Sequence, residues 1–142
     1  MIQMRVLALD LGTKNIGTAI SDELGISVRP AGTIRRSGLR RDIARLISLV
    51  QDLEAQAVVV GLPLRMDGTL GEAARRALNF ADKLRGEIGV AVYTEDERLT
   101  SYEADQIMIA RGMKRKQRQA NSDQMAATII LRDFLSRTTD HN

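Results

Sequence analysis

The stretch RVLALDLGTKNIGTAI, residues 5–20, places one carboxylate, Asp10, inside an otherwise apolar strand. With the two-residue period of a strand, Asp10 shares a face with Val6 and Ala8. Because burying an unpaired charge costs several kcal/mol or more, this carboxylate needs a cation, a metal ion or a water-filled cleft beside it. Lys14 is the nearest candidate cation, so a simple salt bridge is the structural alternative to a functional site.

The residues after Asp10 predict a tight turn. Gly12 and Gly17 bracket Thr13-Lys14-Asn15 and favour a hairpin that returns as a second strand over residues 17–21. A D-x-G-T-x turn followed by a strand cradles the phosphates of ATP in actin-like and sugar-kinase folds. It also holds a catalytic metal in ribonuclease H-like nucleases, and the stretch alone leaves both interpretations open.

The size and composition of the chain narrow this choice. Its 142 residues predict one domain over residues 1–137 with a polar tail at 138–142, too short for the two lobes of an actin-like kinase. No apolar run approaches the roughly 20 residues that span a bilayer, and no secretory signal is evident, so we expect a soluble, cytoplasmic protein. The absence of cysteine excludes thiol chemistry, and the single histidine, His141, lies next to the end, where catalysis is not expected.

The charge balance points weakly toward nucleic acid. Lys and Arg exceed Asp and Glu by 21 to 18, and the calculated pI is about 9.7. Aromatic residues make up only 3% of the chain, with no tryptophan, so few side chains can stack on single-stranded bases. We therefore expect any nucleic acid to be bound through its backbone and shape.

Hydrophobic periodicity predicts an α/β chain that begins with three antiparallel strands and continues by right-handed crossovers into parallel strands. In the third strand, Pro30 and Gly32 favour an edge position or a bulge. Arg75 and Arg76 could contact phosphate, but we favour their assignment to the solvent-exposed face of a helix. After the first hairpin, the predicted elements are strands at 26–34, 57–61 and 89–94 and helices at 39–53 and 71–85.

Further acids follow the last predicted strand. Glu95-Asp96-Glu97 would repel one another unless cations gather there, although capping by Thr100 and a salt bridge to Arg98 offer a partial structural explanation. Asp123 falls in the first turn of a helix predicted from residue 121 or 122 to 136, where the helix dipole favours an acid in any case.

Between these acids lies a basic segment, RGMKRKQR at residues 111–118, with five cations and no acid. Gly112 argues against a continuous helix, so we predict a mobile basic loop that steers a polyanion. If Asp10, the acids at 95–97 and Asp123 converge, divalent cations would relieve their repulsion, and two ions roughly 4 Å apart can hydrolyse a phosphodiester.

Four motifs, ALDLGTKNIGTAISD, VVVGLPLRMDGT, EDERLTSYEA and NSDQMAATIIL, resemble the YqgF/RuvX family over nearly the whole chain. The resemblance implies a ribonuclease H-like fold with a five-stranded mixed sheet of order 3-2-1-4-5. It implies Asp10, Glu97 and Asp123 as catalytic acids and ligands of Mg²⁺ or Mn²⁺, two ions per site. Glu97 matches the acid before the Arg of the family's D-E-R, and strand alternation places it on the same face as Glu95.

The resemblance also implies a substrate: the 5′ end of precursor 16S rRNA, or a four-way DNA junction. A junction cut symmetrically calls for two active sites and hence a homodimer, whereas rRNA trimming does not. A non-catalytic binding factor in ribosome assembly or transcription is the alternative function. The residues expected to contact nucleic acid are Lys14, Arg98, Arg111, Lys114, Arg115, Lys116 and Arg118.

Overall fold

The computed structural model describes residues 4–65, 67–97, 106–107, 110–112 and 115–139, with the side chains of 115–122 and 138–139 left out. Eight elements are described in this part of the chain. The strands are β1 (Val6–Leu11), β2 (Asn15–Ser21), β3 (Val28–Arg35), β4 (Ala57–Leu62) and β5 (Ala91–Asp96). The helices are α1 (Leu39–Asp52), α2 (Glu72–Arg85) and α4 (Arg115–Thr139).

The five strands form one mixed sheet of order β3-β2-β1-β4-β5, which confirms the predicted order. β1 pairs antiparallel with β2 and parallel with β4, and β5 extends the parallel half. β1 is therefore central in the sheet. Its carboxyl end leads into the β1–β2 turn and lies at the same edge of the sheet as the carboxyl ends of β4 and β5. Loops at this edge of an α/β sheet are the usual place for a functional site.

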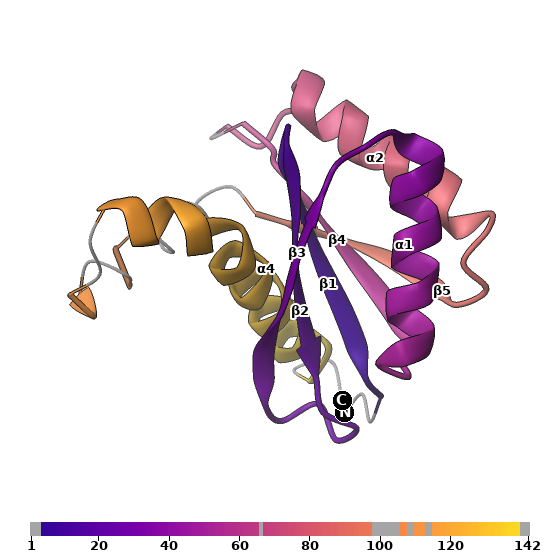
Figure 1. Ribbon diagram of the computed structural model, residues 1–142, viewed down its shortest axis with the longest axis horizontal. Coiled ribbons are helices and arrows are strands. Elements are labelled where there is room, and N and C mark those ends of the chain that lie inside the picture. Colours follow the sequence, from indigo (N-terminus) through magenta and orange to yellow (C-terminus); the bar gives the residue numbers. More distant parts are fainter. Residues whose placement is uncertain (1–3, 66, 98–105, 108–109, 113–114, 140–142) are drawn as a thin grey trace.

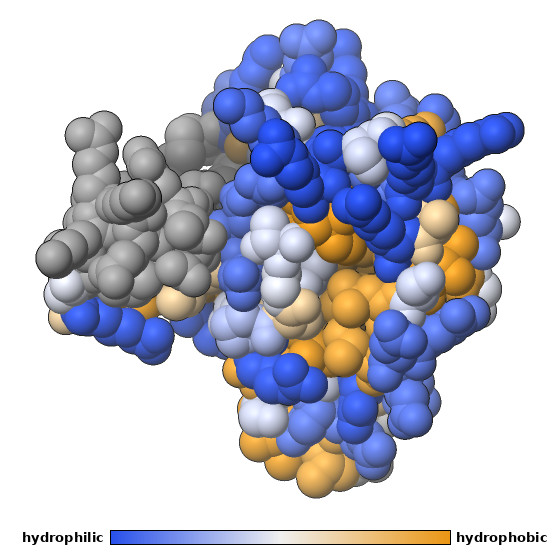
Figure 2. Space-filling view, viewed as in Figure 1, coloured by the Kyte–Doolittle hydropathy of each residue, from blue (hydrophilic) through white to orange (hydrophobic). Residues whose placement is uncertain are grey.

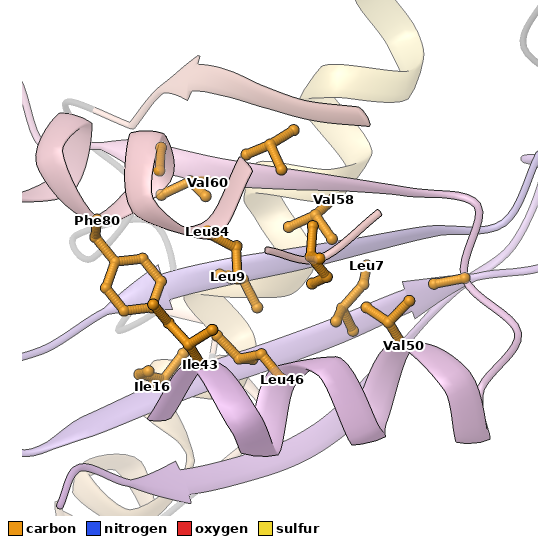
Figure 3. Packing of buried hydrophobic residues seen from close by; sticks show 14 of the residues in the cluster. Leu7, Leu9, Ile16, Ile43, Leu46, Val50, Val58, Val60, Phe80 and Leu84 are labelled. Atoms are coloured by element: carbon orange, nitrogen blue, oxygen red, sulfur yellow. The ribbon is translucent and has the colours of Figure 1, made fainter. Parts of the chain in front are cut away.

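The sheet has two differently covered faces. Figure 1 shows α1 and α2 on one face and α4 on the other. On the first face, Ile43 and Leu46 of α1 point toward Leu7 and Leu9 of β1, in a fully apolar cluster that also includes Phe80 (Figure 3). A smaller cluster on the second face joins the alternate strand residues to α4; among its members are Val6, Ala8, Val59, Ala127, Ile130, Leu131 and Phe134.

The third strand lies at the sheet edge and contains the predicted irregularity. Its pairing with β2 shifts between Thr18 and Ala19, whose partners are Gly32 and Pro30, so one residue of β3 is extra.

Beyond β2, Leu24 and Ile26 are 51% and 71% exposed. The face seen in Figure 2 is mostly hydrophilic, with one apolar area between β3 and α1 and another at its lower end, where Figure 1 shows the β2–β3 connection.

The last helix differs most from the sequence-based prediction. α4 begins at Arg115, so the segment predicted as a loop up to Arg118 is helical over its second half. Asp123 therefore lies more than two turns inside the helix, and the predicted caps at 121 and 122 are interior residues. The helix prediction after Thr100 lies mostly outside the described residues, as does the polar tail from 140 onward. None of the described helices is both long and apolar enough to cross a membrane.

Candidate active site

Asp10 lies near the end of β1 on the face covered by α4. Its neighbours on the same face, Val6 and Ala8, pack in the α4 cluster, whereas Leu7 and Leu9 pack under α1. The alternation predicted from the sequence is thus confirmed. The β1–β2 turn closes just beyond Asp10, where the amide of Gly12 donates a 2.8 Å hydrogen bond to the carbonyl of Asn15.

Two glycines flank Asp10 in the neighbouring strands, and each leaves room for another acid. Gly17 is the partner of Asp10 in β2, and a Cβ there would lie 2.1 Å from the carbonyl oxygen of Asp123. Gly61 in β4 follows Val60, the partner of Leu9, and a Cβ there would lie 2.8 Å from Glu97 Oε2. Real Cβ atoms do not come this close to other atoms, so the lack of a side chain at these two glycines lets α4 and Glu97 approach the sheet.

Asp10 and Glu97 form a carboxyl–carboxylate hydrogen bond. Burial, the proximity of Asp10 and the bond to it raise the pKa of Glu97 to about 9, so Glu97 carries the proton at neutral pH and donates it to Asp10. Burial also raises the pKa of Asp10 to about 6, against the lowering effect of this hydrogen bond, and the charge of Asp123 raises it further. The pair therefore shares one proton, as expected for two acids held in direct contact.

Asp123 lies beside this pair. Its backbone rests over Gly17, and its carboxylate accepts a hydrogen bond from the side chain of Asn15, the first residue of β2. Burial raises the pKa of Asp123 and the bond from Asn15 lowers it, with burial the larger effect. The next residue of α4, Gln124, donates a side-chain hydrogen bond of 3.1 Å to Thr33 Oγ1 and links the helix to β3.

All three predicted acids line one cleft of about 520 Å³. Its walls come from the β1–β2 turn, the start of the β3–α1 connection, the β4–α2 loop, α2, the end of β5 and α4. Within the described part of the chain, its lining residues are Asp10, Leu11, Gly12, Thr13, Arg36, Pro63, Ala73, Arg76, Ala77, Phe80, Glu97 and Asp123.

The three acids have the right chemistry to bind a divalent cation, but their arrangement fits one only partly. Their donors are all carboxylate oxygens, which Mg²⁺ and Mn²⁺ prefer, and the proton between Asp10 and Glu97 occupies the place where positive charge is needed. Among the residues with described side chains, no group of three or more acids or histidines is arranged so that it could hold a metal ion. Asp10 and Glu97 are the two acids in direct contact, and Asp123 is the third acid of the same cleft, so these are the residues that could hold a metal ion there.

The neighbouring charged residues have other partners. Glu95 points to the same face as Glu97, is 2% exposed, and forms an ion pair with Arg137 near the end of α4. Lys14 is exposed, and within the described ranges Asp10 has no ion pair with it. The salt bridge considered as the alternative role for Asp10 is therefore wrong.

The predicted nucleic-acid contacts remain predictions. Arg111 is exposed, and its amide donates to the carbonyl of Ile107. Arg98 and Lys114 lie outside the described residues. The backbone of Arg115, Lys116 and Arg118 belongs to the first turn of α4, and their side chains lie outside the description.

Two charged residues of the cleft, Arg36 and Arg76, were not among the predicted site residues. Arg36 follows the third strand directly, and nothing in its local pattern indicates the cleft. Arg76 was assigned to a solvent-exposed helix face; it is exposed, but it also lines the cleft. The stripe Ala73, Arg76, Ala77 and Phe80 at helical spacing was the available signal, since these residues share one face of α2.

Comparison with known proteins gives a family for the chain. The model of the family described as "RuvX: Holliday junction resolvase" matches residues 4–137. Two relatives named as candidate pre-16S rRNA nucleases are each 42% identical. The one from Lachnospira eligens aligns over 135 residues, covering 93% of this chain and 96% of the relative; the one from Moorella thermoacetica aligns over 134 residues, covering 94% and 96%.

Solved structures agree with the fold. RuvC of T. thermophilus, in complex with a Holliday junction substrate, has a TM-score of 0.61 at 19% identity and covers 96% of each chain. The Holliday junction resolvase of fowlpox virus has a TM-score of 0.61 at 13% identity, covering 94% of this chain and 99% of that one. At these identities the likeness concerns the fold alone.

Proposed function

Because this chain belongs to the RuvX family of Holliday junction resolvases, and is thereby a nuclease, we propose that it hydrolyses phosphodiester bonds with the aid of divalent metal ions bound by Asp10, Glu97 and Asp123. The observation that carries this proposal is that three acids from distant parts of the sequence line one cleft. No cysteine is present, and the single histidine, His141, lies outside the described residues.

The chain's own residues would prepare the site for this chemistry. Asp10 and Glu97 lie within hydrogen-bond distance of each other and share one proton, and a cation bound between them would replace that proton and neutralise both carboxylates. Asn15 orients the carboxylate of Asp123 toward the cleft. Bound Mg²⁺ or Mn²⁺, two ions in our proposal, would activate the attacking water and stabilise the leaving oxygen.

Two substrates have support from the comparisons. The relatives at 42% identity are named for pre-16S rRNA, which favours the 5′ end of precursor 16S rRNA as the substrate. The family description names Holliday junctions, which favours branched DNA. We rank the rRNA first because the relatives named for it are 42% identical to this chain, whereas the junction-bound structure is 19% identical. Both substrates place the protein in the cytoplasm, and only symmetric junction cutting requires a homodimer.

The proposal is tested by comparing the wild type with Asp10→Asn on both substrates. A precursor 16S rRNA 5′ end and a four-way DNA junction are incubated with purified protein and Mg²⁺, Mn²⁺ or EDTA. We expect metal-dependent cleavage of at least one substrate by the wild type. Asp10→Asn should reduce cleavage by at least about 10²-fold, because it removes a ligand from the centre of the site.

A matched control separates chemistry from folding. Asp52→Asn changes an exposed acid at the end of α1 and should cleave as the wild type does. Asp10→Asn should still bind both substrates. If the wild type binds but cuts neither substrate with any of these metals, the protein is a binding factor and the nuclease mechanism is wrong.

A further inference from the structure

The cleft contains positive as well as negative side chains, and the positive ones have no role in holding a metal. We propose that Arg36 and Arg76 form a phosphate-binding wall of the cleft, which receives a phosphodiester next to the one that is cut. The proposal rests on the nuclease function above and adds a subsite to it. The ligand is defined by its chemistry, a nucleic-acid phosphate, in RNA or in DNA.

Arg36 is held in place by three contacts. Its Nη1 donates a 2.9 Å hydrogen bond to the carbonyl of Gly12, its Nε lies 3.5 Å from Asp42 Oδ2, and the guanidinium lies 5.8 Å from the ring centre of Phe80. Asp42 is 1% exposed, and the side chain of Arg36 is 32% exposed. Within the described part of the chain, Nη2 has no hydrogen-bond partner, although the guanidinium lines the cleft. An arginine fixed on one edge with donors left over suits a phosphate.

Arg76 reaches the same cleft from α2. It is 63% exposed and 3.8 Å from Glu72, an i,i+4 pair of exposed side chains that contributes little to stability. A phosphate can therefore replace this partner at small cost. Arg75, the preceding residue of α2, is also exposed and does not line the cleft.

The two arginines are not simply counter-ions of the catalytic acids. Among the described ion pairs, Arg36 is joined to Asp42 and Arg76 to Glu72. Neither forms a salt bridge with Asp10, Glu97 or Asp123, although all five side chains line the cleft. An extended anion is the ligand that can contact both sets at once, with one phosphate at the acids and a neighbouring one at the arginines.

The chain offers a matched control for each arginine. Arg76→Gln is compared with Arg75→Gln, and Arg36→Gln with Arg35→Gln, since Arg35 is exposed and does not line the cleft. Binding to the four-way DNA junction and to the precursor rRNA end is measured in EDTA over a range of salt concentrations. Arg76→Gln and Arg36→Gln should each lower the slope of log affinity against log salt by about one, and the controls by clearly less.

Substrates with single neutral methylphosphonates, placed one by one beside the cut, identify the contact. At one position the neutral group should weaken binding by the wild type and leave binding by Arg76→Gln unchanged. If Arg36→Gln fails to fold because the buried Asp42 loses its ion-pair partner and keeps only the hydrogen bond from the Ser37 amide, the comparison of Arg76→Gln with Arg75→Gln decides alone, with circular dichroism as the folding check.

The outcomes separate this inference from the proposed nuclease. Equal slopes for Arg76→Gln and Arg75→Gln, or an Arg76→Gln defect that persists on every methylphosphonate substrate, would overturn the arginine wall. A wild type that cuts no substrate would overturn the nuclease proposal instead, while the binding comparison still tests the two arginines. The RNA and DNA arms show which polynucleotide the wall prefers.

Discussion

The hydrogen bond between Asp10 and Glu97 is the feature with the clearest energetic cost. Burial and repulsion raise the pKa of Glu97 from 4.5 to about 9. A raised folded-state pKa in an acid means that the folded chain binds a proton that the unfolded chain releases. Stability therefore falls as the pH rises through the interval between these two values, so the metal-free site opposes folding at neutral and alkaline pH.

We predict that Glu97→Gln stabilises the metal-free protein at alkaline pH. The amide keeps the shape of the side chain and does not ionise, so the variant avoids the loss of stability across this interval. One pKa unit corresponds to about 1.4 kcal/mol, so the variant should gain more than about 1 kcal/mol over the wild type at about pH 8 relative to about pH 5. Denaturant unfolding in EDTA at both pH values measures the difference.

The same samples give an internal control. Added Mg²⁺ should raise the stability of the wild type at about pH 8 and have a much smaller effect on Glu97→Gln, because the amide is a poorer metal ligand than the carboxylate. Asp52→Asn, which changes an exposed acid outside the cleft, should keep the wild-type pH dependence of stability and the wild-type response to Mg²⁺. A wild type whose stability rises from about pH 5 to about pH 8 in EDTA would contradict the assignment of the proton to Glu97.

At the scale of elements, the site depends on how closely α4 and the end of β5 approach the sheet. Gly17 and Gly61 lie on either side of Asp10, and the space of their missing side chains is occupied by the Asp123 backbone and by Glu97 together with Ile130. A methyl group at either position has to displace one of these groups. The glycines are thus required for proximity rather than for backbone conformation.

We predict that Gly17→Ala and Gly61→Ala reduce cleavage strongly while the chain still folds. Overpacking of this kind typically costs about 1–3 kcal/mol, and Gly17→Ala pushes α4 and Asp123 away from Asp10. Gly86→Ala is the matched control, because the nearest atom to its added Cβ would be 3.6 Å away, an ordinary van der Waals distance. Thermal unfolding and cleavage assays on the three variants measure both effects; full activity in Gly17→Ala would show that α4 need not lie so close.

The elements also show what the sequence could and could not predict. The strand order and the face of Asp10 follow from alternation in residues 5–20 and from the resemblance of the motifs. The start of α4 does not follow from the sequence, because Asn121 and Ser122 look like helix caps and Gly112 looks like a break. Instead α4 packs across β1, β2 and β3, and this packing outweighs the local capping preference. Arg36 was unpredictable because its place depends on the path of the connection after β3.

At the scale of the molecule, the sheet separates a purely structural face from a face that also carries chemistry. Under α1 and α2 the core is continuous and apolar (Figure 3), whereas on the α4 face the strand that supplies Val6 and Ala8 to the apolar cluster continues to Asp10 in the cleft. The basic segment at 111–118 runs into α4, so five of the predicted nucleic-acid contacts lie in the same continuous part of the chain as Asp123.

We predict that nucleic-acid binding depends on where charge is removed. Changing Lys114, Arg115, Lys116 and Arg118 together to Gln should flatten the salt dependence of binding, by about one unit of slope for each phosphate that these side chains neutralise. Changing Arg29, Arg40, Arg41 and Lys83, all exposed and outside the cleft, removes the same charge and should have a smaller effect. Equal slopes for the two quadruple variants would show that net charge, and not this segment, governs binding.

The two glycine positions beside Asp10 also bear on how the protein can change in evolution. A complete single-substitution library should rank Gly17 and Gly61 with the acids in intolerance, although neither glycine has a group that ionises or binds. Descendants that keep every carboxylate and gain a methyl group at either place would be inactive enzymes whose motifs still look intact. Gene surveys that score only the acids would count such inactive descendants as working nucleases.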